Sequence, residues 1–260
     1  MSYQSPWPAP LSPWADPPWL MSGRCLTAWF ETDTDRVRSL LSSSFIPRLG
    51  KKGVVTRLRF YDIDYSPAST EEVLIPSNSG SFKEAVVAFA GEIAGVRGEY
   101  SAFMWTDSLS YFSWGRENFG WPLLISEIEL SGAFWDSSSE DQVRSSICAE
   151  GASWELVSDN QAQETLTIGS AANWLTPRRS LFTSTGAFEE RDLLIVRPKI
   201  MEPGLLTAHT GDLRFSASPE SIFAGLQPLG SCTVHQHSRF RLSVGGDVES
   251  KTATIREFPE

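Results

Sequence analysis

Most of the chain beyond residue 50 consists of β-strand-like segments separated by turn-forming residues. The segments are rich in Val, Ile, Leu, Thr or aromatic residues, and Gly, Pro, Asn, Asp or Ser bounds them. Candidate strands cover residues 53–65, 83–93, 98–114, 123–135, 146–157, 163–170, 191–199, 206–215 and 231–248. Because no regular succession of helices interrupts these segments, the pattern favours an antiparallel barrel or sandwich over a fold built from βαβ units.

The order of these segments indicates a single domain with two short extensions. A chain of 260 residues is long enough to bury a full hydrophobic core, and its sequence contains no internal repeat or linker. We therefore predict one domain over residues 23–250. Residues 1–22 are rich in Pro and Trp, which disfavours a helix and predicts an extended arm packed on the domain. Residues 251–260 form a C-terminal tail in this division.

One short helix is expected near the start of the domain. Asp33 or Thr34 can cap it, because a short oxygen-bearing side chain accepts hydrogen bonds from the free N–H groups of a first helical turn. Val37, Leu40 and Leu41 follow at the spacing that places them on one helical face. An amphipathic helix should therefore precede the first long candidate strand.

Composition narrows the class of ligand. The formal net charge of −10 argues against a nucleic-acid-binding surface, which needs a basic footprint. The chain contains 10 Trp and 15 Phe. These rings indicate either an aromatic-rich core or a cavity lined by flat apolar rings for a small organic substrate, and composition leaves both alternatives open.

Cysteine usage and the N-terminal sequence predict a cytoplasmic protein. Cys25, Cys148 and Cys232 are odd in number and lack the C-x-x-C spacing, so free thiols are expected rather than a disulfide framework or a zinc site. The first twenty residues lack the basic and apolar regions of a secretory signal. No apolar run approaches the roughly 18 residues that a membrane span needs. We therefore expect no membrane attachment.

The most specific motif lies near the middle of the chain. Residues 115–124 read Gly-Arg-Glu-Asn-Phe-Gly-Trp-Pro-Leu-Leu, and this run resembles the active-site segment of the acetoacetate decarboxylase family. Further matching stretches occur in the family's order, and they are Gly23-Arg24, Ser81-Phe82-Lys83-Glu84 and Gly98-Glu99-Tyr100 with Met104 and Asp107. The resemblance implies a closed antiparallel β-structure around a conical apolar cavity. It also implies a homo-oligomer, because family members often assemble.

The resemblance breaks at the residue that performs the family's reaction. In the family, lysine follows the proline and attacks the ketone of a β-keto acid; this is the known chemistry of acetoacetate decarboxylase rather than a deduction from the present residues. Here Leu123 and Leu124 follow Pro122, and leucine cannot form the iminium through which carbon dioxide leaves. Lys83 does not replace the lysine, because adjacent strand residues point to opposite faces and its neighbour Glu84 is expected in the cavity.

The resemblance also supplies two candidate catalytic residues. Arg24 matches the family arginine and would bind a carboxylate or enolate oxygen. Glu84 matches the family glutamate, and burial among aromatic rings would raise its pKa and make it a general acid or base.

Asp62 is a third candidate catalytic residue. In a regular strand, Asp62 and Asp64 share a face with Leu58 and Phe60, which breaks the usual alternation and places a carboxylate towards the cavity. The alternative is a bulge near Tyr61, which would turn both aspartates towards water.

The predicted substrate-binding residues surround the position of the missing lysine or lie on nearby strands; they are Tyr61, Met104, Arg116, Phe119, Trp121 and Leu123. Phe119 and Trp121 would flank that position, and Leu123 would make it apolar. His235 and His237 share a strand face, but without a third ligand nearby they predict no metal site. No cofactor is implied.

Three functions fit these residues. The first is an enzyme of secondary-metabolite biosynthesis that uses Glu/Arg acid–base or hydrogen-bond assistance for dehydration, isomerisation or cyclisation, including pericyclic cyclisation, of a polyketide- or terpenoid-like intermediate. The second is a non-catalytic protein that binds an apolar ligand. The third is a β-keto acid decarboxylase that uses another lysine. Because Arg24 and Glu84 are kept while the lysine is lost, we favour the first, a lyase, cyclase or isomerase.

Overall fold

The computed structural model describes residues 18–41, 44–67, 80–131, 142–159, 162–167, 172–177 and 191–253. Most of these residues lie in β-strands and the helices are short, which confirms the predicted mainly β class. Most of the expected N-terminal arm and the end of the tail lie outside the described residues. Among the helices that are described, none has the length and apolar character needed to cross a bilayer.

A large curved sheet forms the framework. In the described part of the chain it has thirteen strands. Its main path runs β10 (Glu164–Thr165), β14 (Leu205–His209), β16 (Thr233–Val244), β1 (Trp19–Thr32), β3 (Val54–Pro67), β4 (Gly80–Ile93), β5 (Val96–Thr106), β11 (Trp174–Pro177), β12 (Arg191–Val196) and β17 (Val248–Ala253). Three further strands pair beside this path, namely β13 (Lys199–Glu202) on β16, β2 (Phe45–Pro47) on β4 and β6 (Leu123–Ile125) on β5. The pairs β5–β6 and β5–β11 are parallel.

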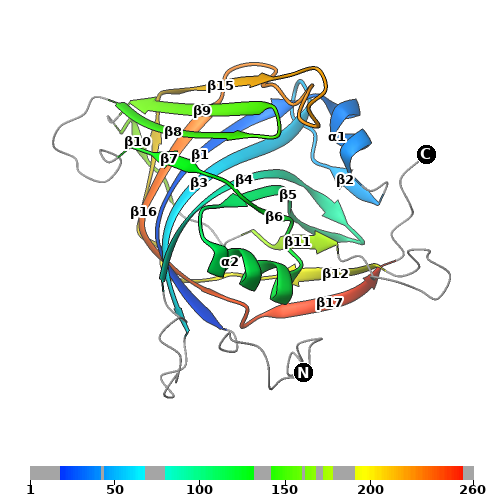
Figure 1. Cartoon of the computed structure of the whole chain (residues 1–260), viewed down its shortest axis with the longest axis vertical. Coiled ribbons are helices and arrows are strands. Elements are labelled where there is room, and N and C mark those ends of the chain that lie inside the picture. Colours follow the sequence, from blue (N-terminus) through cyan, green and yellow to red (C-terminus); the bar gives the residue numbers. More distant parts are fainter. Residues whose placement is uncertain are drawn as a thin grey trace.

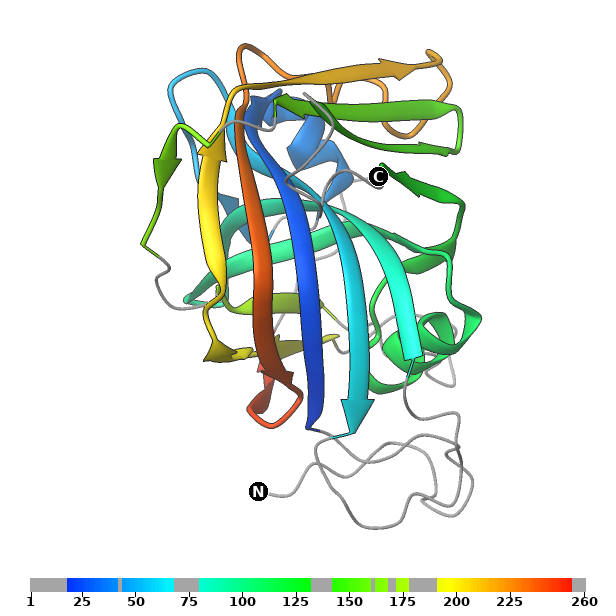
Figure 2. The same cartoon turned by 90° about the vertical axis from the view of Figure 1, so that its left-hand side faces the viewer.

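The large sheet is open rather than closed into a barrel. Its strand order has two ends, β10 and β17, and no ladder joins them among the described residues. Figure 2 shows the long strands β16, β1, β3 and β4 running side by side and bending along their length. The closure implied by the family resemblance is therefore not found in the part of the chain that the structure describes.

A second sheet covers part of the outer face of the first (Figure 1). In the described residues it has four strands, in the order β15 (Gly211–Ala217), β9 (Ala152–Asp159), β8 (Gln142–Ala149) and β7 (Ile128–Leu130). Leu58 and Phe60 of β3 pack with Trp154 of β9 in the hydrophobic core between the sheets. We call the face of the large sheet that carries Leu58 and Phe60 its outer face, and the opposite face its inner face.

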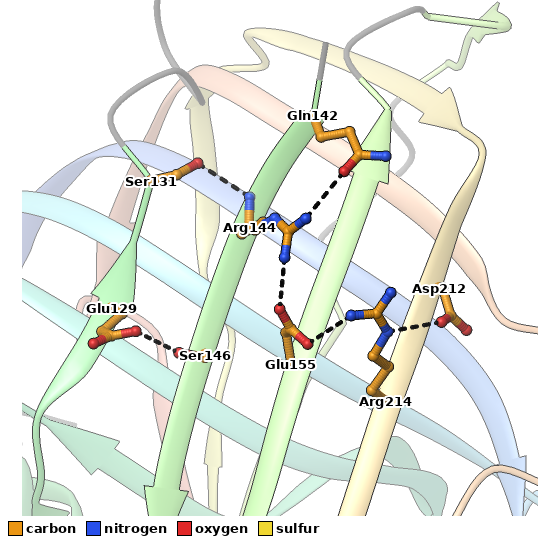
Figure 3. Close-up of polar contacts among 8 residues, drawn as sticks. All are labelled: Glu129, Ser131, Gln142, Arg144, Ser146, Glu155, Asp212 and Arg214. Atoms are coloured by element: carbon orange, nitrogen blue, oxygen red, sulfur yellow. Dashed lines mark hydrogen bonds and ion pairs between the residues drawn. The ribbon is translucent and has the colours of Figure 1, made fainter. Parts of the chain in front are cut away.

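The solvent-facing side of the small sheet carries an ion-pair network (Figure 3). Glu155 of β9 lies between Arg144 of β8 and Arg214 of β15, with N–O distances of 3.2 and 3.1 Å. Arg214 also pairs with Asp212, at 3.3 Å. We call Arg144, Glu155 and Arg214 the surface cluster. Cross-strand neighbours of opposite charge are typical of a solvated sheet face.

Several predicted strands are wrong in part because a local change of direction was missed, and two of them lie close to the site. Residues 146–157 were expected as one strand, but β8 and β9 form a hairpin whose turn places Glu150 and Gly151 at φ angles of 50° and 75°. The expected strand 98–114 ends at Thr106, where the chain enters the helix α2 (Leu109–Trp114). The Ser108 hydroxyl caps α2 by accepting the Tyr111 N–H at 3.3 Å.

The N-terminal part of the fold contains a confirmed helix and a strand that was not predicted. The helix α1 (Thr34–Leu40) begins at the predicted cap, where Asp33 Oδ1 accepts the N–H of Arg36 at 2.7 Å, and Val37 is buried. The strand β1 begins at Trp19, inside the stretch expected as an arm, and it pairs with both β16 and β3. Its central place follows from this double pairing, which strand propensity alone does not indicate.

Candidate active site

The inner face of β3 carries the polar residues of the site. Every second side chain in this part of the strand points to the inner face and lines one cavity, namely Arg59, Tyr61 and Ile63. The register of β3 with β1 and β4 is unbroken through Tyr61, so the strand contains no bulge there. Strict alternation therefore holds along β3, and the side chains between these three point to the outer face.

Asp62 consequently lies on the outer face, away from the cavity. It pairs with Arg24 at an N–O distance of 3.4 Å, and each side chain is about one-third exposed. Arg24 is outward because it stands opposite Asp62 across β1 and β3, whereas its neighbour Cys25 stands opposite Tyr61 on the inner face. Of the three predicted catalytic residues, only Glu84 lines the cavity.

The cavity is small, with a free volume of about 30 Å³, and six of its fourteen lining residues are aromatic. Its walls are formed by Met21, Arg59, Tyr61, Ile63, Phe82, Glu84, Val86, Ser101, Met104, Tyr111, Trp121, Trp174, Phe240 and Leu242. A space of this size holds a water molecule, whereas drug-sized ligands occupy cavities of roughly 300–1,000 Å³. A larger substrate would therefore need the aromatic walls to move.

Glu84 is the titratable carboxyl group of the cavity. It is buried on β4, directly opposite Tyr61 of β3 and Thr106 of β5. Burial raises its pKa to about 7, while the Tyr111 hydrogen bond and the charge of Arg59 partly offset that rise. Near neutral pH both protonation states are populated, as a general acid–base residue requires.

Tyr111 of α2 holds Glu84 in place. Its hydroxyl donates a hydrogen bond to Glu84 Oε1 at 3.1 Å. Burial and the adjacent carboxylate raise the pKa of Tyr111 well above its ordinary value, so this hydroxyl keeps its proton. Its ring stacks on Phe82 with centroids 3.6 Å apart. The helix therefore delivers a fixed, neutral donor to the carboxyl group.

A buried group of one glutamate and two arginines lies beside Glu84. Arg59 donates to the Tyr61 hydroxyl at 3.0 Å and lies 3.1 Å from Glu99 of β5. Arg57 also forms an ion pair with Glu99, and its guanidinium lies 3.9 Å from the ring centroid of Trp29. We call Arg57, Arg59 and Glu99 the buried cluster.

Burial dominates the electrostatics of this cluster. Burial, followed by repulsion from Arg59, lowers the pKa of Arg57 to about 9. Burial also raises the pKa of Tyr61, so that it remains a neutral hydroxyl. The Nε atoms of Arg57 and Arg59 are buried and have no hydrogen-bond partner among the described residues.

The position of the missing lysine is filled by hydrocarbon. Leu123 of β6 is fully buried, stands opposite Met104 of β5, and packs directly over Gly115. A Cβ atom on Gly115 would come within 2.4 Å of Leu123 Cδ1, so the Leu123 side chain would have to shift to admit it. Leu124 points outward and is 38% exposed. Leu123 thus forms part of the packed wall behind the cavity.

The other predicted binding residues fall into two groups. Met104, Tyr61 and Trp121 line the cavity. Phe119 is buried one layer behind and stacks on Trp121 with centroids 4.5 Å apart. Arg116 is exposed, with its guanidinium 5.2 Å from the ring centroid of Phe112, and it does not reach the cavity.

No lysine is present among the described residues that line the cavity. Lys83 lies on the outer face of β4, as predicted from the position of Glu84, and its Nζ donates to the Ile128 carbonyl at 3.4 Å. Lys51, Lys52 and Lys199 are exposed.

The two histidines of β16 do not form a metal site in the described structure. A ring nitrogen of His237 lies 2.6 Å from the Pro203 carbonyl. No group of three metal-ligating side chains occurs in the part of the chain that is described. The three cysteines are free thiols.

Sequence reasoning missed the cationic part of the site. Arg57, Arg59 and Tyr61 recur at every second position of a strand whose intervening residues are apolar, and this pattern marks a second buried face. Glu99 was noted only as part of the Gly98-Glu99-Tyr100 match to the family. Tyr111 was missed as a site residue because the segment that contains it was predicted to be a strand.

The comparisons with known proteins agree with this architecture. The family model for acetoacetate decarboxylase (ADC) matches residues 4–152, which is more than half of the chain. The chain therefore belongs to the acetoacetate decarboxylase family. No curated protein sequence matched it significantly.

Solved structures of related proteins show the same fold. Acetoacetate decarboxylase from Legionella pneumophila superposes with a TM-score of 0.73 at 12% identity, covering 96% of this chain and 94% of that one. An acetoacetate decarboxylase-like enzyme from Sphingomonas wittichii RW1 gives 0.68 at 16% identity, with 97% and 100% covered. The enduracididine biosynthesis enzyme MppR, complexed with pyruvate, gives 0.67 at 17% identity, with 93% and 92% covered. At these identities the similarity establishes the fold alone.

Proposed function

We propose that the protein is an enzyme of secondary-metabolite biosynthesis that performs acid–base catalysis on a small organic substrate without a Schiff base. The observation that carries this proposal is Glu84, a buried carboxyl group with a pKa of about 7 that accepts a hydrogen bond from Tyr111 inside an aromatic cavity. Leu123 occupies the position where the family resemblance expects the lysine. The remaining groups favour proton transfer over covalent catalysis.

In the proposed mechanism, Glu84 moves a proton between two atoms of the substrate. Its carboxylate removes a proton next to a carbonyl group, and the resulting enolate oxygen is stabilised by Arg59. Protonated Glu84 then returns the proton to another carbon, which is an isomerisation, or to a departing hydroxyl group, which is a dehydration. Arg59 thus takes the role expected of Arg24, because Arg59 lines the same cavity as Glu84.

The free volume of about 30 Å³ limits what enters the cavity. We propose that only the reacting end of a polyketide- or terpenoid-like substrate is enclosed, or that Trp121 and Tyr111 move apart on binding. Cyclisation, including pericyclic cyclisation, would need the second arrangement, because the whole folded substrate must then be held.

The structural relatives support this proposal at the level of the fold. MppR is an enduracididine biosynthesis enzyme and has been crystallised with pyruvate, so a protein of this fold binds an oxo acid in a biosynthetic context. We also propose a cytoplasmic location, consistent with the free thiols, and assembly into a homo-oligomer.

Exchange of the pyruvate methyl protons in D₂O, followed by NMR at pH 8.5 with saturating pyruvate, tests the acid–base role. We expect the wild-type protein to promote exchange and Glu84→Gln to slow it by about 100-fold or more, the usual contribution of a positioned acid or base. Glu155→Gln is the matched control, because Glu155 lies on the solvent-facing side of the small sheet. Equal exchange rates for wild type and Glu84→Gln would contradict the proposal.

A further inference from the structure

The charges around the cavity do not balance when Glu84 is neutral. Arg57 and Arg59 carry two positive charges, and Glu99 carries one negative charge against both. Glu84 is the remaining carboxyl group of this region, and it lines the same cavity as Arg59. The net charge of these four groups is therefore zero when Glu84 is ionised and +1 when it is protonated.

The buried guanidinium groups also retain hydrogen-bonding capacity. The Nε donors of Arg57 and Arg59 are buried without a partner among the described residues. A buried donor that lacks an acceptor costs free energy, and an anionic ligand placed beside Arg59 would offset that cost. Arg59 is the member of the buried cluster that lines the cavity, so the anion would bind there.

We propose that the cavity binds a monoanion together with one proton, and that Glu84 takes up this proton. The inference rests on the proposed function, since it concerns the same site, and it specifies the charge of the ligand and the protonation state of the complex. Because Arg59 and Glu84 line the same small cavity, an anion that enters it and binds Arg59 lies close to Glu84. Two like charges at that separation disfavour ionisation of the carboxyl group, so the anion replaces the negative charge of Glu84.

Apart from Glu99, whose carboxylate is paired with both arginines, the titratable groups that face Glu84 in the described structure already carry their protons. Tyr61 on β3 and Tyr111 on α2 face the carboxyl group, and burial raises the pKa of both, so each is already protonated. Arg59 faces it as a cation held by Glu99. On the neighbouring strand β5, the residue opposite Glu84 is Thr106, which does not titrate.

Thermodynamic linkage between anion binding and protonation of Glu84 determines how the affinity for the anion depends on pH. If the anion raises the pKa of Glu84, protonation strengthens anion binding by the same factor. Affinity should then be highest below the pKa of the free protein, which is about 7, and should fall as pH rises above it. A shift of one pKa unit corresponds to about a tenfold change in affinity. At neutral pH most of the complex would therefore hold Glu84 as the acid, and the carboxylate that removes the first proton would become the main form as pH rises above the pKa of the complex.

Calorimetric titration of the whole chain with pyruvate tests the coupling. Binding heats would be measured at pH 8 and at pH 6, each in two buffers that differ in ionisation enthalpy and contain no carboxylate or phosphate. For a rise of one unit in the pKa of Glu84, we expect uptake of about 0.4 proton per bound anion at pH 8 and close to none at pH 6, with about fivefold weaker binding at pH 8. Acetate and acetoacetate serve as further monoanion probes.

Two variants and their controls make the result specific. Glu84→Gln should bind pyruvate with no proton uptake at either pH, and Arg59→Gln should lose binding while Arg59→Lys retains part of it. Glu155→Gln and Arg214→Gln, on the solvent-facing side of the small sheet, should behave as wild type.

Saturable binding by the wild type without proton uptake at pH 8 would overturn the coupling and leave the acid–base function intact. Failure of all three monoanions to bind would also overturn it, whereas loss of the acid–base function alone would appear as pyruvate binding with proton uptake but without exchange of the methyl protons.

Discussion

The buried cluster and the surface cluster have the same composition, one glutamate between two arginines, but opposite electrostatic behaviour. In the surface cluster, hydrogen bonding to Glu155 raises the pKa of Arg214. In the buried cluster, loss of water lowers the pKa of Arg57 to about 9 even though Glu99 is its partner. The comparison teaches that ion pairing by itself does not define a functional site. What distinguishes the buried cluster is enclosure, because enclosed charges are not screened and their imbalance must be met by a ligand or a proton.

Removing the shared carboxylate is the strongest way to test this contrast. Glu99→Gln should destabilise the protein by about 3–5 kcal/mol, since it leaves two buried guanidinium groups without a counter-charge. Glu155→Gln should change the free energy of unfolding by no more than about 0.5 kcal/mol, because water solvates its two partners. Urea denaturation at low ionic strength, which does not screen the charges, measures both variants. Equal losses of stability would show that burial does not separate the two clusters.

The pH dependence of stability is a second test. The pKa of Glu84 is raised from 4.5 to about 7 in the folded protein. Its contribution to stability is therefore fully present below pH 4.5 and is lost as pH rises through about 7. Relative to Glu84→Gln, the wild type should lose about 3 kcal/mol between pH 4.5 and pH 8, measured by urea denaturation across this range. Glu155→Gln should keep the wild-type slope. A wild type and a Glu84→Gln variant with parallel profiles would remove the evidence for a buried, protonatable carboxyl group.

Tyr111→Phe should give a smaller change in the same direction. The Tyr111 hydrogen bond lowers the pKa of Glu84, so its loss should raise that pKa further, by about one unit. The pH midpoint of pyruvate proton exchange, measured by NMR, should move upward by the same amount. Tyr65→Phe, on the neighbouring part of β3, provides a control that keeps the hydrogen bond to Glu84. A midpoint that moves downward, or not at all, would exclude Tyr111 as the group that positions the carboxyl.

The last prediction is that the protein forms no covalent adduct with a β-keto acid. The cations of the buried cluster are guanidinium groups, and no lysine lines the described cavity. Borohydride treatment in the presence of acetoacetate should therefore produce no lysine-linked adduct by mass spectrometry. An adduct on any lysine would restore the decarboxylase alternative, in which that amine, rather than the site beside the buried cluster, performs the chemistry.

Several features of the fold could be predicted from the sequence because they depend on short-range patterns. The strand-rich class follows from β-propensity and turn residues, and the α1 cap follows from Asp33. Alternation along β4 separated Lys83 from Glu84 correctly. The β8–β9 turn and the helix α2 were missed, because Glu150 adopts a positive φ angle and Tyr111 belongs to an aromatic run typical of strands.

The sequence by itself determined the mainly β class, the family motif and the absence of an amine after Pro122. It also determined which residues of a strand share a face, since the period of two is a property of the backbone. Only the tertiary structure decided which face encloses the cavity. Arg24 points outward with Asp62, and Arg59 points inward with Tyr61, because β3 pairs with β1 and β4 in a register that no local pattern specifies. Burial then determined the chemistry, since enclosure among rings from distant segments raises the pKa of Glu84. Glu155 is paired with two arginines, as Glu99 is, but on a solvent-facing sheet.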